Sequence, residues 1–373
     1  MKILMVISHY YPTPGGTERQ AHQLARALTG RGHEVHVLTM RHGPGPAVTN
    51  IEGVPIYRAI HGIQRGALFG LSYLLTATVA ILRLGRDAEV LHTHHLYLDA
   101  IAAVGAGRIL RVPTLAKVAC GGAVGDLARL RGTTGGRVFL RILHGLDRVA
   151  TPSRQTEAEV RAAGFPEGRV VRIPNGVDIS RFAPAGAVRT DRSARTVLFL
   201  GRLDPQKGVN VLLGAWNEVA FCQPDTTLVI GGVGPEEAAL RAAATRPGLA
   251  GRVRFLGAVP DPGAHLRTAA AFVLPSWHEG LPNALLEAMA TGLPCVATAI
   301  GGTTDVATDE SDALLVPPGD AAALAKALLR ILTDADLAGR LGAAARRRVV
   351  AAFSLDATVI RYEQVYREMR DAA

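Results

Sequence analysis

Short apolar runs alternate along this chain with longer segments of helical periodicity, and this alternation restricts the fold more than any other feature. The apolar run 2–7 is followed by a glycine-containing loop and by a helical pattern over 16–28. Gly30 and Gly32 stop that pattern, and 34–39 is the next apolar run. Such a rhythm predicts βα units, in which helices cover both faces of a parallel sheet.

The rhythm is interrupted once, and the interruption predicts two domains. Further apolar runs lie at 90–93, 114–118, 148–150 and 170–173, and then at 196–200, 227–230, 253–256, 271–274 and 295–298. Residues 174–195 between the two sets have turn-forming residues and no periodicity. We predict an α/β protein with two Rossmann-like, doubly wound domains over 1–178 and 196–354, joined by a linker over 179–195. Ligands of such sheets bind at the carboxyl ends of the strands, so we expect a site in a cleft between the domains.

Composition excludes several classes of protein. An apolar content of 48% with 20% charged residues excludes a disordered chain. Three widely spaced cysteines, Cys120, Cys222 and Cys295, exclude a disulfide scaffold and predict a reducing, cytoplasmic location. The net charge of +9 suits a phosphorylated small molecule or an acidic membrane surface. Aromatic residues make up only 5% and do not alternate with basic ones, so we expect no nucleic acid partner.

Two segments bear on membrane contact. Residues 66–82 carry no charge but are short for a membrane span, and we expect a buried helix there. Farther along, Arg137, Arg141, His144 and Arg148 fall on or near one face of a predicted helix. Either this helix packs on the core with a solvated basic face, or it lies on an anionic membrane, which would be a peripheral contact at the inner face.

A glycine pair follows the first predicted strand, in the motif Pro14-Gly15-Gly16-Thr17-Glu18. Paired glycines let a ligand approach the backbone, and the amides of a helix N-terminus attract an anion. A plain turn with a helix start would explain the motif as well. Its spacing matches neither a dinucleotide fingerprint nor a Walker loop.

Two cations stand in the loop after the strand predicted at 196–200. Arg202 and Lys207 are the only basic residues of 201–208, a segment that leads into a helix. A guanidinium fork and an ammonium group beside a helix N-terminus suit a diphosphate. Taken alone, the two residues could equally be solvated loop charges.

Two acids follow the strand predicted at 271–274. Glu279 falls in the strand-to-helix loop, on the side where ligands of such sheets bind. Glu287 falls inside the next helix, predicted over 283–290, among the apolar residues of 285–289. A carboxylate in such a run is costly unless a polar group pairs with it, and sugar or ribose hydroxyls would do so. The simpler explanations are that a glutamate near the helix N-terminus interacts favourably with the helix dipole, and that a glutamate within the helix lies on its solvent-exposed face.

Two other patterns resemble metal sites but have better explanations. His92-x-His94-His95 ends a predicted strand without a matching carboxylate or cysteine set, which favours packing or a substrate contact. Asp334-x-Asp336 starts a predicted helix far from any strand end, which favours N-capping. We therefore expect no metal site.

Together these residues resemble the family 4 retaining glycosyltransferases of the GT-B fold, also called group 1 glycosyltransferases. The resemblance rests on four motifs that occur in the family's order along nearly the whole chain. They are Gly15-Gly16-x-Glu18, Thr151-Pro152-Ser153 with Ile173-Pro174-Asn175-Gly176-Val177-Asp178 and Arg181-Phe182, Gly201-Arg202-Leu203 with Lys207-Gly208, and Glu279-x7-Glu287. The last pair is the most specific.

The resemblance implies a nucleotide-diphosphate sugar on the C-terminal domain and a hydroxyl acceptor mainly on the N-terminal domain. Arg202 and Lys207 would stabilise the leaving diphosphate without a metal ion, and with Glu279 they form the implied catalytic set. The implied donor contacts are the Gly16 amide at the phosphate, Val259 near the base, Glu287 at the ribose, and Glu279 with the backbone of Gly280 and Leu281 at the sugar. The helix over 355–373 would pack back on the N-terminal domain.

The chain departs from the family at one position. Many members carry a histidine after the strand predicted here at 114–118, where this chain has Ala119-Cys120-Gly121-Gly122. We expect His94, Lys117 or Cys120 to replace that contact on the acceptor side.

The predicted activity is retaining, metal-independent transfer of a sugar, most often UDP-linked, to a hydroxyl of an envelope glycan, a glycolipid or a small metabolite. No cofactor is expected besides the donor substrate. The alternatives are a nucleotide-sugar binding protein without transfer activity, which the departure at Cys120 favours, and a GT-B sugar-nucleotide epimerase.

Overall fold

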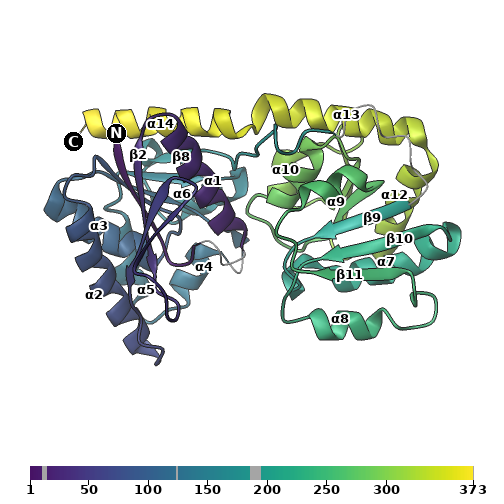
Figure 1. The fold of residues 1–373 in the computed structure, drawn as a ribbon, viewed down its shortest axis with the longest axis horizontal. Coiled ribbons are helices and arrows are strands. Elements are labelled where there is room, and N and C mark those ends of the chain that lie inside the picture. Colours follow the sequence, from purple (N-terminus) through teal and green to yellow (C-terminus); the bar gives the residue numbers. More distant parts are fainter. Residues whose placement is uncertain (11–14, 123–124, 185–194, 373) are drawn as a thin grey trace. The chain divides into compact units, whose positions relative to one another are not determined.

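The computed structural model of the chain describes residues 1–10, 15–122, 125–184 and 195–372 (Figure 1). It divides into two compact units: unit 1 comprises Met1–Gly176 and Leu355–Ala373, and unit 2 comprises Val177–Ser354. The boundary between the two units lies between Gly176 and Val177, two residues before the predicted end of the first domain at residue 178. The described residues of the predicted linker belong to unit 2.

Unit 1 is built on a sheet with the strand order β3-β4-β2-β1-β5-β6-β7-β8. The strands are β1 (Lys2–Ile7), β2 (Glu34–Met40), β3 (Val48–Ile51), β4 (Val54–Ile60), β5 (Val90–Thr93), β6 (Thr114–Lys117), β7 (Arg148–Thr151) and β8 (Val170–Arg172). Every neighbouring pair is parallel except β3 and β4, which form an antiparallel hairpin. The predicted parallel sheet is confirmed, and the hairpin at its edge is an addition that the sequence pattern did not reveal.

Helices cover both faces of this sheet. They are α1 (Gly16–Gly30), α2 (Ala67–Leu84), α3 (Leu98–Leu110), α4 (Asp126–Arg131), α5 (Gly136–Leu143), α6 (Arg154–Ala162) and α14 (Leu355–Asp371), with the short 3-10 helix η2 (Glu167–Arg169). On β1, Leu4 and Val6 join the core formed with α2 and α3, whereas Ile3 and Met5 join the core formed with α1 and α14. Successive side chains of a strand point to opposite faces, so a strand covered on both sides is a continuous apolar run.

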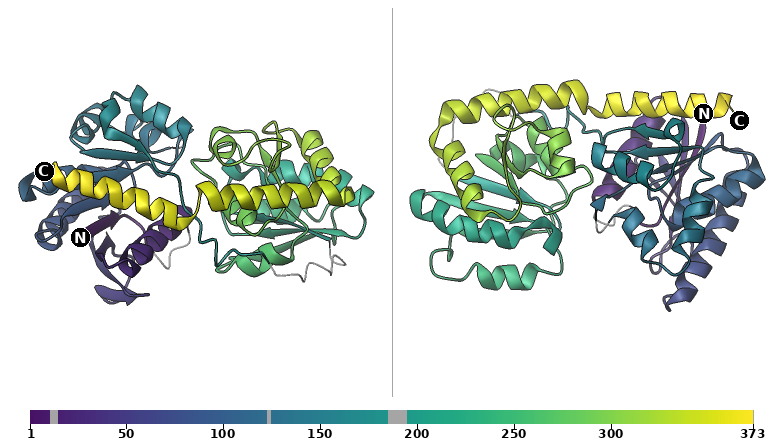
Figure 2. Two further views of the ribbon diagram at one scale, coloured as in Figure 1. Left: turned by 90° about the horizontal axis from the view of Figure 1, so that it is seen from above. Right: turned by 180° about the vertical axis from the view of Figure 1, so that it is seen from behind.

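The C-terminal helix α14 lies beside α1 in unit 1, as Figure 2 shows. Its buried carboxylate, Glu363, accepts hydrogen bonds from Arg31 Nε at 2.8 Å and Nη2 at 3.1 Å, and it lies 2.9 Å from His33 Nε2. The Arg31 guanidinium, with His33, lowers the pKa of Glu363 to about 2 although burial opposes this. The helix is therefore held by a charged anchor as well as by apolar packing.

Two helices of unit 1 differ from what the sequence predicted. The uncharged stretch does form a helix, α2, but Leu68, Leu71 and Leu75 on it are exposed, so the expectation of a buried helix is wrong for one face. The basic pattern near 137–148 is likewise shorter than expected, because α5 ends at Leu143 and Arg148 begins β7. Within the described ranges, no helix is long and apolar enough to cross a membrane.

Unit 2 is a parallel sheet with the strand order β11-β10-β9-β12-β13-β14. Its strands are β9 (Arg195–Leu200), β10 (Thr226–Gly231), β11 (Val253–Gly257), β12 (Ala271–Leu274), β13 (Cys295–Thr298) and β14 (Leu314–Val316). Its helices are α7 (Val209–Cys222), α8 (Glu237–Ala243), α9 (Gly263–Thr268), α10 (Asn283–Ala290), α11 (Gly301–Val306), α12 (Ala321–Thr333) and α13 (Ala335–Ala352), with the 3-10 helix η3 (Pro205–Lys207). The strand bounds 271–274 and 295–298 and the helix bounds 283–290 agree with the prediction.

The strand order of unit 2 reverses between β9 and β12. The chain runs from β9 outward through β10 to β11, and then returns to place β12 on the other side of β9. The loops that leave the carboxyl ends of β9 and β12 therefore diverge, and such a switch point is where open α/β sheets bind ligands. Away from this edge, Asp334 accepts a 2.9 Å hydrogen bond from the Leu337 amide at the start of α13, which confirms the expected N-cap.

Candidate active site

The loops after β9 and β12 are joined by an ion pair at the switch point of unit 2. Lys207 Nζ lies 2.7 Å from Glu279 Oε1, and the Ser276 hydroxyl donates to the same carboxylate oxygen at 2.7 Å. The side chains of Lys207 and Glu279 are only 20% and 8% exposed. The pair is thus shielded from the solvent that makes surface ion pairs weak.

Hydrogen bonds fix the two loops to each other. The Trp277 amide donates to the Gln206 carbonyl at 2.8 Å, and Gln206 Nε2 donates to the His278 carbonyl at 2.8 Å. Gly208 follows Lys207 with φ of +63°, and a Cβ there would collide with the Pro275 carbonyl oxygen. Only glycine allows this left-handed turn and this close approach, so Gly208 lets the two loops come together where Lys207 meets Glu279.

Arg202, the second predicted cation, has a different carboxylate partner. Its Nε and Nη2 atoms donate to Asp204 Oδ2 at 2.9 and 2.7 Å. The Arg202 side chain is 68% exposed, whereas Asp204 is buried. A guanidinium group has five donor hydrogens, so this pairing orients Arg202 and leaves its Nη1 edge able to meet another anion.

The other predicted donor residues of unit 2 lie in the segments that follow β11 and β12. Gly280 and Leu281 are buried in the loop after β12, and a Cβ on Gly302 at the start of α11 would lie 2.8 Å from the Gly280 oxygen. Glu287 is buried within α10, the helix that follows this loop. Val259 is half-buried just beyond β11, where it covers the end of β10 at Gly231.

In unit 1, two of the predicted acceptor-side residues are buried side by side. In the β5–β6 register Thr93 pairs with Ala116, so His94 and Lys117 follow as neighbours. Neither ring nitrogen of His94 has a hydrogen-bond partner among the described residues. Burial lowers the pKa of Lys117 to about 8, and burial together with the charges of His92 and Lys117 lowers the pKa of His94. Cys120 is half-buried, and its thiol donates to the Gly121 carbonyl at 3.4 Å.

The glycine pair occupies the start of α1. Gly15 is the N-cap residue in an extended conformation, and a Cβ on it would collide with the Glu18 carboxylate. Gly16 is the exposed first residue of the helix. Pro14 lies outside the described residues. The contact between Gly16 and a phosphate stays a prediction.

Sequence reasoning missed a hydrogen-bond network at the switch point of unit 1, between β1 and β5. Buried Asp99 accepts bonds from the Ser8 amide at 3.2 Å, the Ser8 hydroxyl at 2.9 Å and the Tyr73 hydroxyl, and it lies 3.3 Å from His95 Nδ1. Burial opposes ionisation of Asp99, but His95 and these hydrogen bonds keep its pKa below the usual value. The spacing of His95 and Asp99, four residues apart, was the available signal for this pair.

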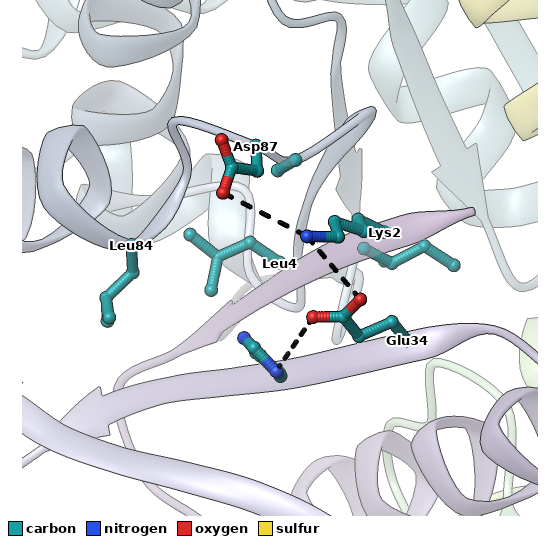
Figure 3. A pocket seen from close by; sticks show the side chains of 8 residues that line it. Lys2, Leu4, Glu34, Leu84 and Asp87 are labelled. Atoms are coloured by element: carbon teal, nitrogen blue, oxygen red, sulfur yellow. Dashed lines mark ion pairs between the residues drawn. The ribbon is translucent and has the colours of Figure 1, made fainter.

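The polar pocket of unit 1 that Figure 3 shows lies at the amino ends of the strands, opposite the carboxyl ends where Ser8 and Asp99 meet. Its ion pairs join Lys2 Nζ to Glu34 at 3.6 Å and to Asp87 at 3.9 Å. Lys2 and Glu34 stand at the amino ends of β1 and β2, away from the ligand-binding edge of such a sheet. In the part of the chain that the structure describes, no group of three or more His, Cys, Asp or Glu side chains could hold a metal ion.

Comparisons with solved structures define the class of protein. Sucrose-phosphate synthase from Thermosynechococcus elongatus superposes with a TM-score of 0.82 at 28% identity, and all of both chains is covered. Anabaena HepE, solved in complex with UDP and glucose, superposes with a TM-score of 0.81 at 19% identity over 98% of this chain and 99% of that one, and it shows the shared fold. The fold is GT-B.

Sequence comparisons identify the family. The family model for Glycosyltransferase Family 4 matches residues 14–181, and the model for Glycosyl transferases group 1 matches 194–334. A phosphatidyl-myo-inositol mannosyltransferase of Mycobacterium leprae is 32% identical over 94% of this chain and 92% of its own. A glycogen synthase of Mycobacterium tuberculosis is 29% identical over 98% and 94%. The chain belongs to the family 4, group 1 glycosyltransferases, and the protein is a glycosyltransferase that uses a nucleotide-sugar donor.

Proposed function

We propose that this protein moves a sugar from a UDP-linked donor to a hydroxyl acceptor, with retention of the anomeric configuration and without a metal ion. The observation that carries the proposal is the shielded Lys207–Glu279 pair at the switch point of unit 2. An ammonium group fixed at that edge, next to the N-terminus of α7, suits the diphosphate of a nucleotide sugar. The UDP and glucose bound by HepE support UDP as the carrier.

The proposed chemistry uses the charges of one loop. Lys207 and the Nη1 edge of Arg202 would stabilise the negative charge that develops on the diphosphate as the bond to the sugar breaks. Because these cations neutralise the leaving group, a divalent ion is not needed there. The acceptor hydroxyl would attack on the face that the diphosphate leaves, which keeps the configuration. Glu279 with the backbone of Gly280 and Leu281 would hold the sugar, Glu287 the ribose, and Val259 the base.

A donor panel tests this proposal. Binding to the native state raises its melting temperature, so the protein should be stabilised by UDP-sugars more than by GDP- or ADP-sugars. NMR of the transfer or hydrolysis product should show the anomer of the donor, and EDTA should leave the rate unchanged. An inverted product, or a rate that EDTA abolishes and manganese restores, would contradict the mechanism. Binding without any transfer or donor hydrolysis would favour the non-catalytic alternative, and a changed sugar on the donor would favour an epimerase.

For the acceptor we propose a glycolipid-type hydroxyl compound that the protein meets at an anionic membrane surface. The support is a stripe on α2, formed by Leu68, Leu71, Leu75 and Val79, in which Leu71 and Leu75 are 68% and 65% exposed. Spacings of three and four residues put these side chains on one face of the helix. The helix has no acidic residue, and exposed Arg65 and Arg83 lie at its two ends. Apolar contact together with arginines near lipid headgroups, each contributing about 1 kcal/mol, suits a negatively charged surface.

Flotation with vesicles tests the α2 stripe. Wild-type protein should float with vesicles that contain phosphatidylserine or phosphatidylinositol and not with phosphatidylcholine alone. The double variant Leu71→Gln/Leu75→Gln should lose this binding, whereas Ile360→Gln, which changes an exposed apolar residue of α14, should keep it. Equal binding by all three proteins, or no binding to either kind of vesicle, would refute the membrane contact.

A further inference from the structure

The chain has two tryptophans in contrasting environments. Trp216 is fully buried in α7, and its indole N–H donates to the Arg252 carbonyl at 3.2 Å. Trp277 is 40% exposed and stands in the loop after β12, between Ser276 and Glu279. Large aromatic side chains are normally buried for their apolar surface. The exposed indole of Trp277 stands in the same loop as Glu279 and is therefore a candidate for contact with a ligand.

The Trp277 ring is held in place by glycines of two other loops. Gly319, between β14 and α12, has φ of +81°, and a Cβ there would collide with the six-membered part of the indole. A Cβ on Gly208 would lie 3.5 Å from the indole Nε1 atom. The Trp277 amide is also fixed by its bond to Gln206. The ring is thus seated in a fixed orientation while two fifths of the residue is open to solvent.

The position of Trp277 relative to the strands indicates which part of the ligand it would contact. It follows β12 and contacts the loop after β14, on one side of the switch point. Val259, proposed for the base, follows β11 at the far end of the strand order. Glu279, proposed for the sugar, lies two residues beyond Trp277 in the same loop. A pyranose ring has apolar C–H faces and polar edges, so it suits an indole surface next to a carboxylate.

We propose that Trp277 is a specificity-determining residue whose exposed indole stacks against the sugar of the bound nucleotide sugar. This inference rests on the proposed function and deepens it, because it assigns a second contact to the sugar portion of the donor. A rigid aromatic surface gives contact area at a small cost in conformational entropy. It also favours sugars with a continuous apolar face over sugars in which an axial hydroxyl interrupts that face.

The test compares nucleotide and nucleotide-sugar affinities in wild type, Trp277→Ala and Trp277→Phe, with UDP, GDP, UDP-glucose and GDP-mannose as the probes. Trp277→Ala should weaken the nucleotide-sugar complex by about tenfold and leave the nucleotide complex unchanged. Trp277→Phe, which keeps an aromatic ring, should recover most of the affinity. In wild type the nucleotide sugar should change tryptophan emission more than the nucleotide does, and this difference should vanish in Trp277→Phe, where only buried Trp216 emits.

Each other outcome overturns the inference in a recognisable way. Equal weakening of nucleotide and nucleotide-sugar binding in Trp277→Ala would show a loss of loop structure rather than of a sugar contact, and the melting temperatures would reveal it. Unchanged affinity for every probe would show that the ring does not touch the donor. If wild-type protein bound none of the four probes, the proposed function would fail, and this inference would fail with it.

Discussion

Lys207 of unit 2 and Lys117 of unit 1 both stand near the carboxyl ends of strands in doubly wound sheets, but their surroundings are opposite. Lys207 Nζ is 2.7 Å from the Glu279 carboxylate. Lys117 is buried at the end of β6 beside His94, and among the described residues it has no carboxylate partner. Burial lowers the pKa of Lys117 to about 8.

The contrast separates two uses of a cation at a strand end. Lys207, held by a carboxylate at the ligand-binding edge of the sheet, suits a ligand that always carries negative charge, such as a diphosphate. Lys117 loses its proton at mildly alkaline pH, so its charge in the folded protein depends on what approaches it. The two lysines should therefore respond differently to substitution, one through activity and the other through stability.

Removal of Lys207 gives the largest expected effect. Lys207→Ala should lower turnover by about 10²–10³-fold, because it removes stabilisation of charge that develops in the transition state. The measurement is the initial rate of transfer or donor hydrolysis at saturating donor. Lys326→Ala, which removes an exposed lysine of α12 in the same unit, is the matched control and should keep the wild-type rate. Equal rates in wild type, Lys207→Ala and Lys326→Ala would show that Lys207 does not stabilise the transition state.

Removal of Lys117 should raise stability instead. Its folded pKa of about 8 lies below the ordinary lysine value of 10.5, so the unfolded chain binds more protons between those values and wild-type stability rises with pH through this window. Lys117→Met should therefore be more stable by about 2–3 kcal/mol near pH 7, and the gain should shrink as pH approaches 10. Denaturant unfolding at several pH values measures this. A destabilised variant at pH 7 would show that Lys117 has a favourable partner.

Glu363 extends the comparison to a paired charge within unit 1. Glu363→Gln should destabilise that unit by about 1–2 kcal/mol at pH 7, because Arg31 and His33 lose an ionised acceptor. The folded pKa of about 2 lies below the ordinary glutamate value of 4.5, so the wild-type advantage is complete above pH 4.5 and fades as pH falls toward 2. Thermal unfolding from pH 3 to 7 checks this, with Glu368→Gln on the exposed side of α14 as the control. An advantage that did not change with pH would contradict the ionic anchor.

Much of unit 2 could be predicted from the sequence because its signals are local. The strand at 271–274, the helix at 283–290 and the cap at Asp334 depend on runs, turns and caps that a short window contains. The Lys207–Glu279 pair is different, since 72 residues separate its members. Their meeting depends on β12 lying next to β9, and the family resemblance, rather than periodicity, indicated it.

Unit 1 was harder to predict, for two physical reasons. The β3–β4 hairpin turns at Glu52 and Gly53, and Glu52 adopts φ of +50°, which residues other than glycine rarely do. Near β5, three histidines lie within four residues, and their different surroundings are set by the fold and not by the local sequence. His92 and His94 are buried, whereas His95 turns toward Asp99, a partner that also needs Ser8 and Tyr73 from distant elements.

The affinity for UDP, measured by calorimetric titration of wild type, Lys207→Ala and Lys117→Met, tests the central claim most directly. If the β9–β12 switch point binds the diphosphate, Lys207→Ala should weaken UDP binding by about 10–100-fold, as loss of a charge-assisted hydrogen bond requires, and Lys117→Met should bind like wild type. Wild-type affinity in Lys207→Ala, or a loss confined to Lys117→Met, would contradict the assignment of the donor site to unit 2.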